Sequence, residues 1–171
     1  MKKLIYSLFC LAFVLAGCGR SDPQAGKKLV VYFSASDDGI AEIADMVADK
    51  AGADVFEIVP DDSYTLHQRT TDFKLEQAVP DNWDDYETVY IGGPSWGGLA
   101  DTPVSLFVSQ NNISGKHFHP FTIGTQKTAE DICDQLSGYG AHEGWSDPKG
   151  FSKSATAADV EEWVESTSQQ Q

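Results

Sequence analysis

Positive charge and cysteine are both scarce in this sequence. Its 171 residues include 12 Lys and Arg against 26 Asp and Glu, which gives a formal net charge of -14. This balance excludes a nucleic-acid partner, because a polyanion would be repelled and no basic cluster is present to neutralise phosphates. The chain has 3 cysteines, without a Cys-x-x-Cys pair or a zinc spacing, so a disulfide scaffold and a structural zinc site are also excluded.

Long apolar runs are missing as well, since none reaches the roughly 20 residues that a membrane-spanning helix needs. Hydrophobic side chains nevertheless make up 41% of the sequence, and aromatic ones 11%. That composition is typical of a globular domain that buries a core, and it excludes disorder over most of the chain.

A shorter apolar run opens the chain and is typical of a signal peptide. Lys2 and Lys3 precede the stretch 4–16, which is apolar apart from two residues. Residues 15–18 read Leu-Ala-Gly-Cys, which resembles the cleavage box of bacterial lipoproteins with Cys18 as the lipidated residue. The alternative is an ordinary secretory peptide in which Cys18 has no role.

We therefore expect residues 1–17 to be a lipoprotein signal peptide and residues 18–27 a lipid-anchored tether. Residues 28–166 would form the folded domain, and residues 167–171 a polar tail. On this interpretation the protein is exported and anchored to the cell envelope through Cys18. The anchor would lie in the outer membrane of a Gram-negative cell, and otherwise on the outer face of the cell membrane.

Strand and helix signals alternate along the folded domain. Short apolar runs rich in β-branched and aromatic residues predict strands at 29–33, 55–59, 88–91 and 118–123. A fifth strand, between Gly138 and Ser154, has only a weak signal. The region 61–85 between the second and third strands is polar and is expected to be a connection.

Helix signals follow most of these strands. Apolar residues three and four apart predict a helix over residues 40–51, with Gly52 as its stop. A second helix is predicted to have Thr102 as its cap and Pro103 as its first residue, and to run to about Ser109.

Two further helices are predicted at segments 128–131 and 156–159, which have Thr first and an acidic residue fourth, as in a capping box. The complete order of elements predicts an α/β domain, with a five-stranded parallel sheet and helices on both faces. We expect Trp83, Trp145 and Trp163 to pack in its core.

Ligands of such sheets bind beyond the carboxyl ends of the strands, which makes three loops candidates. The loop after the first strand has hydroxyls and a glycine ahead of a helix, which suits a phosphate. Glycines in the loop after the third strand let the backbone approach a flat ligand, on which Trp96 can stack. The candidate contact residues are Ser34, Ser36 and Gly39 in the first loop, Pro94, Ser95, Trp96, Gly97 and Gly98 in the second, and Gly124 and Thr125 in the third.

Together these features resemble a flavodoxin over about residues 27–165. The resemblance is carried by Val-Val-Tyr-Phe-Ser at 30–34, Gly-Ala-Asp-Val-Phe-Glu-Ile at 52–58 and Ile-Gly-Gly-Pro-Ser-Trp-Gly-Gly at 91–98. It implies a flavodoxin-like three-layer sandwich that holds FMN, with the phosphate at the first loop and the isoalloxazine ring between the second and third. The implied function is an FMN-dependent electron carrier or small reductase at the cell envelope, with an unidentified redox partner.

The first loop departs from the flavodoxin pattern at Asp37 and Asp38, since flavodoxins usually have a Ser/Thr-x-Thr-Gly-x-Thr sequence there. Each carboxylate beside a phosphate dianion would oppose binding by about 1 kcal/mol when solvent screens the charges. Asp38 would otherwise cap the following helix. The alternative function is therefore a cofactor-free binding module that keeps the fold and has lost its phosphate site.

Two other patterns point to different chemistry. Residues 93–97 match Gly-x-Ser-x-Gly, the nucleophile elbow of serine hydrolases, with Ser95 as the nucleophile. That elbow must turn directly into a helix, whereas the next helix signal is at Thr102, so a hydrolase is the weaker hypothesis. His117 and His119 alternate along a strand, but no third ligand is in view, and we expect edge or surface histidines rather than a metal site. We assign no catalytic residue.

The anchor hypothesis makes a testable prediction about location. Wild-type protein should fractionate with membranes and carry lipid, because Cys18 would be acylated after signal cleavage. Cys18→Ser should abolish the lipidated form, as detected by mass spectrometry of the processed chain, and Cys10→Ser should leave it intact. Wild-type protein found free in the soluble exported fraction would contradict the anchor.

Overall fold

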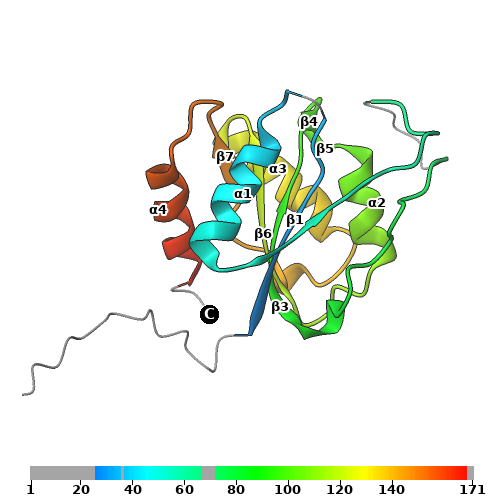
Figure 1. Cartoon of the computed structure of the whole chain (residues 1–171), viewed down its shortest axis with the longest axis horizontal. Coiled ribbons are helices and arrows are strands. Elements are labelled where there is room, and N and C mark those ends of the chain that lie inside the picture. Colours follow the sequence, from blue (N-terminus) through cyan, green and yellow to red (C-terminus); the bar gives the residue numbers. More distant parts are fainter. Residues whose placement is uncertain (1–25, 36, 67–71, 169–171) are drawn as a thin grey trace, which may run out of the picture.

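Five parallel strands form the centre of the structure, in the order β2-β1-β3-β6-β7 across the sheet. The computed structural model describes residues 26–35, 37–66 and 72–168, so the predictions on Cys18 and Ser36 lie outside the described residues. The strands of this sheet are β1 (Lys27–Tyr32), β2 (Asp54–Glu57), β3 (Tyr86–Gly92), β6 (His117–Ile123) and β7 (Lys149–Phe151). The helices are α1 (Ile40–Ala51), α2 (Thr102–Gln110), α3 (Gln126–Ser137) and α4 (Ala157–Ser168), as labelled in Figure 1.

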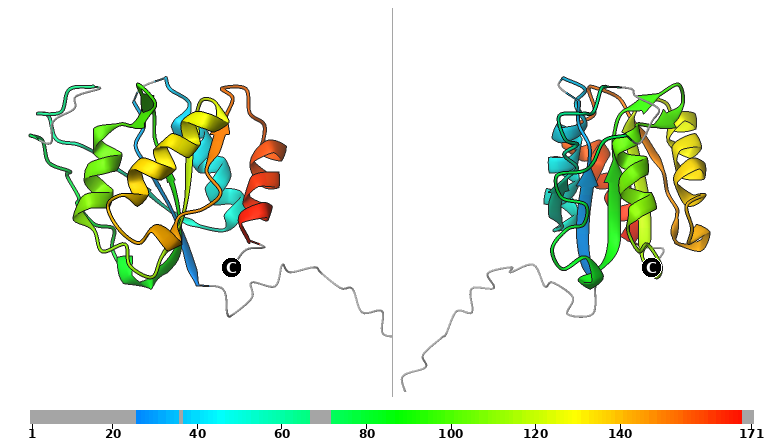
Figure 2. Two further views of the ribbon diagram at one scale, coloured as in Figure 1. Left: turned by 180° about the vertical axis from the view of Figure 1, so that it is seen from behind. Right: turned by 90° about the vertical axis from the view of Figure 1, so that its right-hand side faces the viewer.

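Helices cover both faces of the sheet, with α1 and α4 on one side and α2 and α3 on the other (Figure 2). The predicted α/β sandwich with a five-stranded parallel sheet is therefore confirmed. A small antiparallel hairpin, β4 (Ser95–Trp96) and β5 (Leu99–Ala100), lies outside the main sheet. In the described part of the chain, no helix is both long and apolar enough to span a bilayer.

Strand β1 shows why the first apolar run is continuous. Leu29 and Val31 pack into the layer of α2 and α3, whereas Val30 and Tyr32 pack into the layer of α1 and α4. Successive side chains of a strand point to opposite faces, so a strand covered on both faces needs apolar residues at every position. The pairing of β1 with both β2 and β3 places it inside the sheet.

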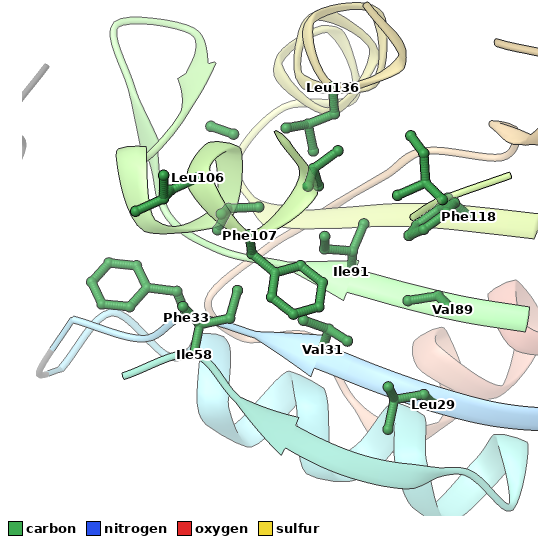
Figure 3. Packing of buried hydrophobic residues seen from close by; sticks show 14 of the residues in the cluster. Leu29, Val31, Phe33, Ile58, Val89, Ile91, Leu106, Phe107, Phe118 and Leu136 are labelled. Carbon is green, nitrogen blue, oxygen red and sulfur yellow. The ribbon is translucent and has the colours of Figure 1, made fainter. Parts of the chain in front are cut away.

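Aromatic side chains fill both layers of the core. Phe107 of α2 is fully buried and points toward Val31 and Ile91 of the sheet (Figure 3). On the opposite face, the ring of Trp163 lies 5.5 Å from that of Tyr90 between centroids. The prediction that Trp83, Trp145 and Trp163 pack in the core is confirmed, since each is less than 9% exposed.

The weak fifth strand has a physical explanation. β7 has 3 residues and pairs with β6 only from Phe121 to Ile123. Earlier in β6, the Phe118 carbonyl accepts the Ser146 N–H, and the chain then passes Asp147, at φ 52, before β7 begins. The backbone of Pro120 faces the same neighbouring chain as that of Phe118, and proline has no N–H to donate. It is tolerated here because that chain has left the hydrogen-bond ladder of the sheet.

Two of the predicted helix caps are wrong, that of α2 by one residue and that of α3 by about one turn. Asp101, not Thr102, caps α2, because its side chain accepts the Thr102 N–H at 2.8 Å. Helix α3 begins one turn earlier than predicted, since Thr125 is its cap and accepts the Thr128 N–H at 3.1 Å. In each case the preceding residue of capping type has the extended backbone that a cap requires.

The other two helix predictions are confirmed. Helix α1 ends at Gly52, whose φ of 62 is the left-handed conformation of a helix stop. At the start of α4, the Asp159 carboxylate accepts the Thr156 N–H at 2.7 Å, and the Thr156 hydroxyl accepts the Asp159 N–H at 3.4 Å. This reciprocal pair is the predicted capping box.

His119 differs from the expected surface histidine, because it is 2% exposed. Its Nδ1 lies 3.6 Å from the Asp147 carboxylate, and its ring packs 5.3 Å from that of Tyr90. The β3–β6 pairing turns this residue toward the α1 and α4 layer, which the alternation with His117 did not reveal. Among the described residues, no group of three His, Cys, Asp or Glu side chains could hold a metal ion.

Burial of His119 predicts a loss of stability in mild acid. Burial lowers the pKa of His119 below its ordinary value of 6.5, and Asp147 only partly opposes this effect. The unfolded chain therefore binds the proton first, and the free energy of unfolding falls as the pH drops through 6.5 toward the lower pKa of the folded state. His119→Phe should lose less of its free energy of unfolding over the same pH range. Urea unfolding between pH 7.5 and 5, a range that spans the ordinary histidine pKa, measures this difference.

An independent variant checks the cause of this pH dependence. Asp147→Asn removes the carboxylate that raises the pKa of His119, so the loss in mild acid should become larger than in wild type. Asn also tolerates the positive φ of this position. Identical pH profiles for wild type and His119→Phe would show that other groups control the acid sensitivity.

Candidate functional site

The loops after β1 and β3 leave the sheet side by side. The chain passes from β1 to β2 on one side and from β3 to β6 on the other, so the connections diverge between β1 and β3. The Phe33 N–H donates to the Gly92 carbonyl at 3.0 Å, which joins the two strand ends. Open α/β sheets bind ligands at such a switch point. The structure thus brings the first two predicted loops to one place, at the upper edge of the sheet in Figure 1.

Glycines in the second loop shape the hairpin that presents Trp96. Gly97 and Gly98 form its turn with φ values of 62 and 84, which is the left-handed pair that a tight hairpin turn requires. A Cβ at Gly98 would meet nothing within 4 Å, so the turn demands glycine for its conformation and not for space. Gly93 differs, because a Cβ there would lie 2.6 Å from the Val104 side chain.

Trp96 lines a cavity of about 340 Å³ between the hairpin, α2 and the end of α3. Leu99, Ala100, Leu106 and Tyr139 form the rest of its apolar wall, and Trp96 and Tyr139 are 37% and 48% exposed. Gln135 contributes polar atoms to the same cavity. These additional lining residues carry no local sequence signal, because α3 reaches the hairpin only through tertiary packing.

Gln135 holds the walls of this cavity together. Its side-chain oxygen accepts the Ala100 N–H of the hairpin at 2.8 Å, and its amide nitrogen donates to the Ser105 hydroxyl of α2 at 3.1 Å. One side chain of α3 therefore fixes both the hairpin and α2. A hydrogen-bonded, partly buried amide of this kind gives the cavity a defined shape before any ligand binds.

Pro94 and Ser95 are placed by the hairpin as well. The Pro94 carbonyl accepts the Asp101 N–H at 3.1 Å, which closes the base of the hairpin. Ser95 lies in β4 and pairs with Ala100, and the rest of the hairpin separates it from α2, which starts at Thr102. This is not the direct strand-to-helix turn of a nucleophile elbow, so the geometry at Ser95 does not support a serine hydrolase.

Gly124 and Thr125 of the third loop form hydrogen bonds with neighbouring elements. The Gly124 N–H donates to the Phe151 carbonyl of β7 at 2.9 Å. The Thr125 hydroxyl caps α3 and lies 2.9 Å from the Thr128 hydroxyl. Both residues lie at the carboxyl end of β6 as predicted, but neither lines the cavity beside Trp96. Their contact with a ring stays a prediction.

The Asp38 carboxylate accepts hydrogen bonds from donors of the first loop. Its Oδ2 accepts the Ala35 N–H at 2.7 Å, and its Oδ1 accepts the Ile40 N–H at 2.9 Å and the Ser34 hydroxyl at 2.8 Å. The N-cap residue of α1 is Gly39, so the prediction that Asp38 is the cap is wrong by one position, although Asp38 does accept the N–H of Ile40, the first residue of the helix. Gly39, at φ 82, forms the turn into the helix.

A sequence profile for flavodoxins matches residues 71–167, more than half of the chain. The chain belongs to the flavodoxin family. No curated protein matches its sequence significantly.

Solved structures share the fold of this flavodoxin-family chain. A protein of Bacteroides uniformis assigned as a flavoprotein is 23% identical, with 83% of this chain and 99% of that chain covered and a TM-score of 0.69. Its counterpart from Bacteroides eggerthii is 20% identical, with coverage of 84% and 99% and a TM-score of 0.70. A Lactobacillus acidophilus flavoprotein in complex with FMN is 14% identical, with coverage of 81% and 99% and a TM-score of 0.56. These identities establish the fold alone.

Flavodoxin-family membership raises the question of whether FMN fits these residues. The cavity beside Trp96 suits a flat aromatic ring, because it joins apolar walls to a few polar groups. The first loop does not suit the phosphate as it stands, since Asp38 already takes the Ser34 hydroxyl and the N–H groups of Ala35 and Ile40. The ring half of FMN therefore fits, and the phosphate half does not.

Loss of the Asp38 carboxylate should destabilise the folded protein. Asp38→Ala leaves three donors without their acceptor, so the free energy of unfolding should fall by about 2 kcal/mol. Asp37→Asn is the matched control, because Asp37 is exposed and Asn tolerates its φ of 66. Urea unfolding at pH 7 measures both changes, and equal stability of Asp38→Ala and wild type would contradict the contacts of Asp38.

Proposed function

We propose that this protein binds a flavin beside Trp96 and acts as an electron carrier or small reductase at the cell envelope, where a lipid on Cys18 anchors it. The observation that supports this most is the cavity of about 340 Å³ with Trp96 on the hairpin that follows β3. Its volume lies at the lower end of the range of about 300–1,000 Å³ for small-molecule pockets. A bound flavin would supply the electron chemistry.

The walls of the cavity match the two parts of an isoalloxazine ring. Trp96 and Tyr139 offer aromatic faces, against which a flat ring packs by offset stacking or edge contacts. Gln135 and Ser105 place an amide and a hydroxyl at the same cavity, where the ring's polar edge needs hydrogen-bond partners. The Lactobacillus flavoprotein of the same fold is in complex with FMN, which supports flavin as the ligand class.

Negative charge at the cavity would lower the reduction potential of a bound flavin. Asp101 lines the cavity and is 2% exposed, and its Oδ1 accepts the Tyr64 hydroxyl at 3.1 Å. A buried carboxylate opposes the addition of an electron nearby, because like charges repel most strongly where water is excluded. Asp101 therefore favours a low potential and the role of an electron donor.

A second candidate is a cofactor-free binding module with the flavodoxin fold. The observation that favours it is the engagement of Ser34, Ala35 and Ile40 by Asp38, which fills the place of a phosphate. The two functions differ in one measurable property. A redox carrier binds a flavin of some kind, whereas the module binds none.

A flavin titration with variants of Trp96 tests the proposed function. Wild-type tryptophan fluorescence should be quenched as riboflavin or FMN is added. Trp96→Ala should weaken flavin binding by about 1–3 kcal/mol, which is the scale of losing a buried aromatic face. Trp96→Phe keeps an aromatic ring at the same position and should retain most of the affinity.

The outcomes separate the candidates. Absence of flavin binding by wild type would leave the cofactor-free module as the function. Equal affinity of Trp96→Ala and wild type would place the ring site away from the hairpin.

A further inference from the structure

We infer that the flavin bound by this protein lacks a phosphate, because Asp38 holds the phosphate's place in the first loop. The ligand class is a neutral flavin whose side chain ends in hydroxyls, as in riboflavin, rather than a phosphomonoester such as FMN. This inference rests on the proposed function for the ring, and it concerns the first loop, which starts beside the second loop at the hydrogen bond from Phe33 to Gly92.

The carboxylate of Asp38 does chemically what a phosphate would do there. Its two oxygens accept the Ala35 N–H, the Ile40 N–H and the Ser34 hydroxyl, at 2.7 to 2.9 Å. Backbone N–H groups at a helix start and a nearby hydroxyl are the donors that bind phosphates in other proteins. A phosphate could take these donors only by expelling Asp38.

The backbone holds Asp38 in this position. Asp37 and Gly39 flank it, and both have left-handed φ values, of 66 and 82. The Asp38 N–H donates to the Ala35 carbonyl at 3.2 Å. This bond closes a turn that holds the carboxylate beside the groups that donate to it. Ile123 lies against Gly39, where a Cβ would be 2.9 Å from its side chain. The loop is therefore folded around an acceptor that belongs to the chain.

The charges around the loop oppose the exchange. Asp37, Asp38 and Glu42 line the hollow outside the loop, and Lys153 is the single cation among the described residues of that lining. An expelled Asp38 would remain beside the incoming dianion, and Glu42 already occupies the favourable position for an anion in the first turn of α1. A phosphate would add two negative charges to a hollow that has an excess of them.

A hydroxyl-bearing side chain meets no such obstacle. A carboxylate has about four lone-pair sites, and Asp38 uses two on Oδ1 and one on Oδ2 for the contacts above. The remaining site on Oδ2 can accept a hydroxyl without displacing any of them. Asp38 thus rejects a phosphate and accepts a polyol, which is the chemical difference between FMN and riboflavin.

Titrations of the full chain in detergent test this inference. Wild type should bind riboflavin more tightly than FMN, by about one tenfold step. Asp38→Thr should improve FMN binding more than tenfold, because it removes the carboxylate and frees the loop's donors, and should not improve riboflavin binding. The matched control Asp37→Asn removes one carboxylate of the loop but leaves Asp38 in place, so the preference for riboflavin should persist. Asp38→Asn, which keeps the size of the side chain, replaces Asp38→Thr if the latter does not fold.

Each outcome decides one of the two proposals. Wild-type binding of FMN as tight as that of riboflavin, or tighter, overturns the inference and leaves the proposed function intact. If wild type binds neither flavin, the proposed function fails, and inorganic phosphate then tests the loop alone by a thermal shift. If phosphate stabilises Asp38→Thr but not wild type, the claim that Asp38 takes the place of a phosphate in the loop is supported. Any other result with phosphate overturns that claim.

Discussion

The burial of β1 on both faces is the constraint on which the rest of the structure depends. Val30 and Val31 are fully buried on opposite sides of this strand, and each such side chain stabilises the fold by about 1.5–3 kcal/mol. Helices must therefore cover both faces, and parallel pairing with β2 and β3 brings the loops after β1 and β3 to one edge. The candidate site exists at that edge because the core requires this arrangement.

The cavity beside Trp96 and the first loop are organised differently. The cavity beside Trp96 is a hollow whose walls are fixed by Gln135 from a third element. At the first loop, Asp38 supplies an acceptor from within the chain, so the N–H groups of Ala35 and Ile40 have a partner without a ligand. One end can thus gain contacts on binding, whereas the other already has them. Flavin recognition by this protein would depend on the ring more than on the opposite end of the molecule.

The fold was predictable from sequence because its signals are local. Apolar spacing and the glycine stop at Gly52 define α1 without reference to any other element. The caps of α2 and α3 were less certain, because Asp101 and Thr125 lie close to other residues of capping type and only the backbone conformation selects between them. The cavity could not be predicted, since Tyr139 and the hairpin meet through the packing of α3. A contact between Asp38 and the start of α1 was foreseen, but the N-cap residue is Gly39, and the contact of Asp38 with Ala35 depends on the fold of the turn.

Both edges of the main sheet are short, with 4 residues in β2 and 3 in β7. An edge strand exposes unpaired N–H and C=O groups that invite a second sheet to pair with it, and short edges offer few of them. Beyond β2 the chain is also protected, because the Glu76 N–H donates to the Val59 carbonyl at 2.8 Å. We expect copies of this protein at high local concentration to remain separate molecules, which leaves each cavity open to small partners diffusing past.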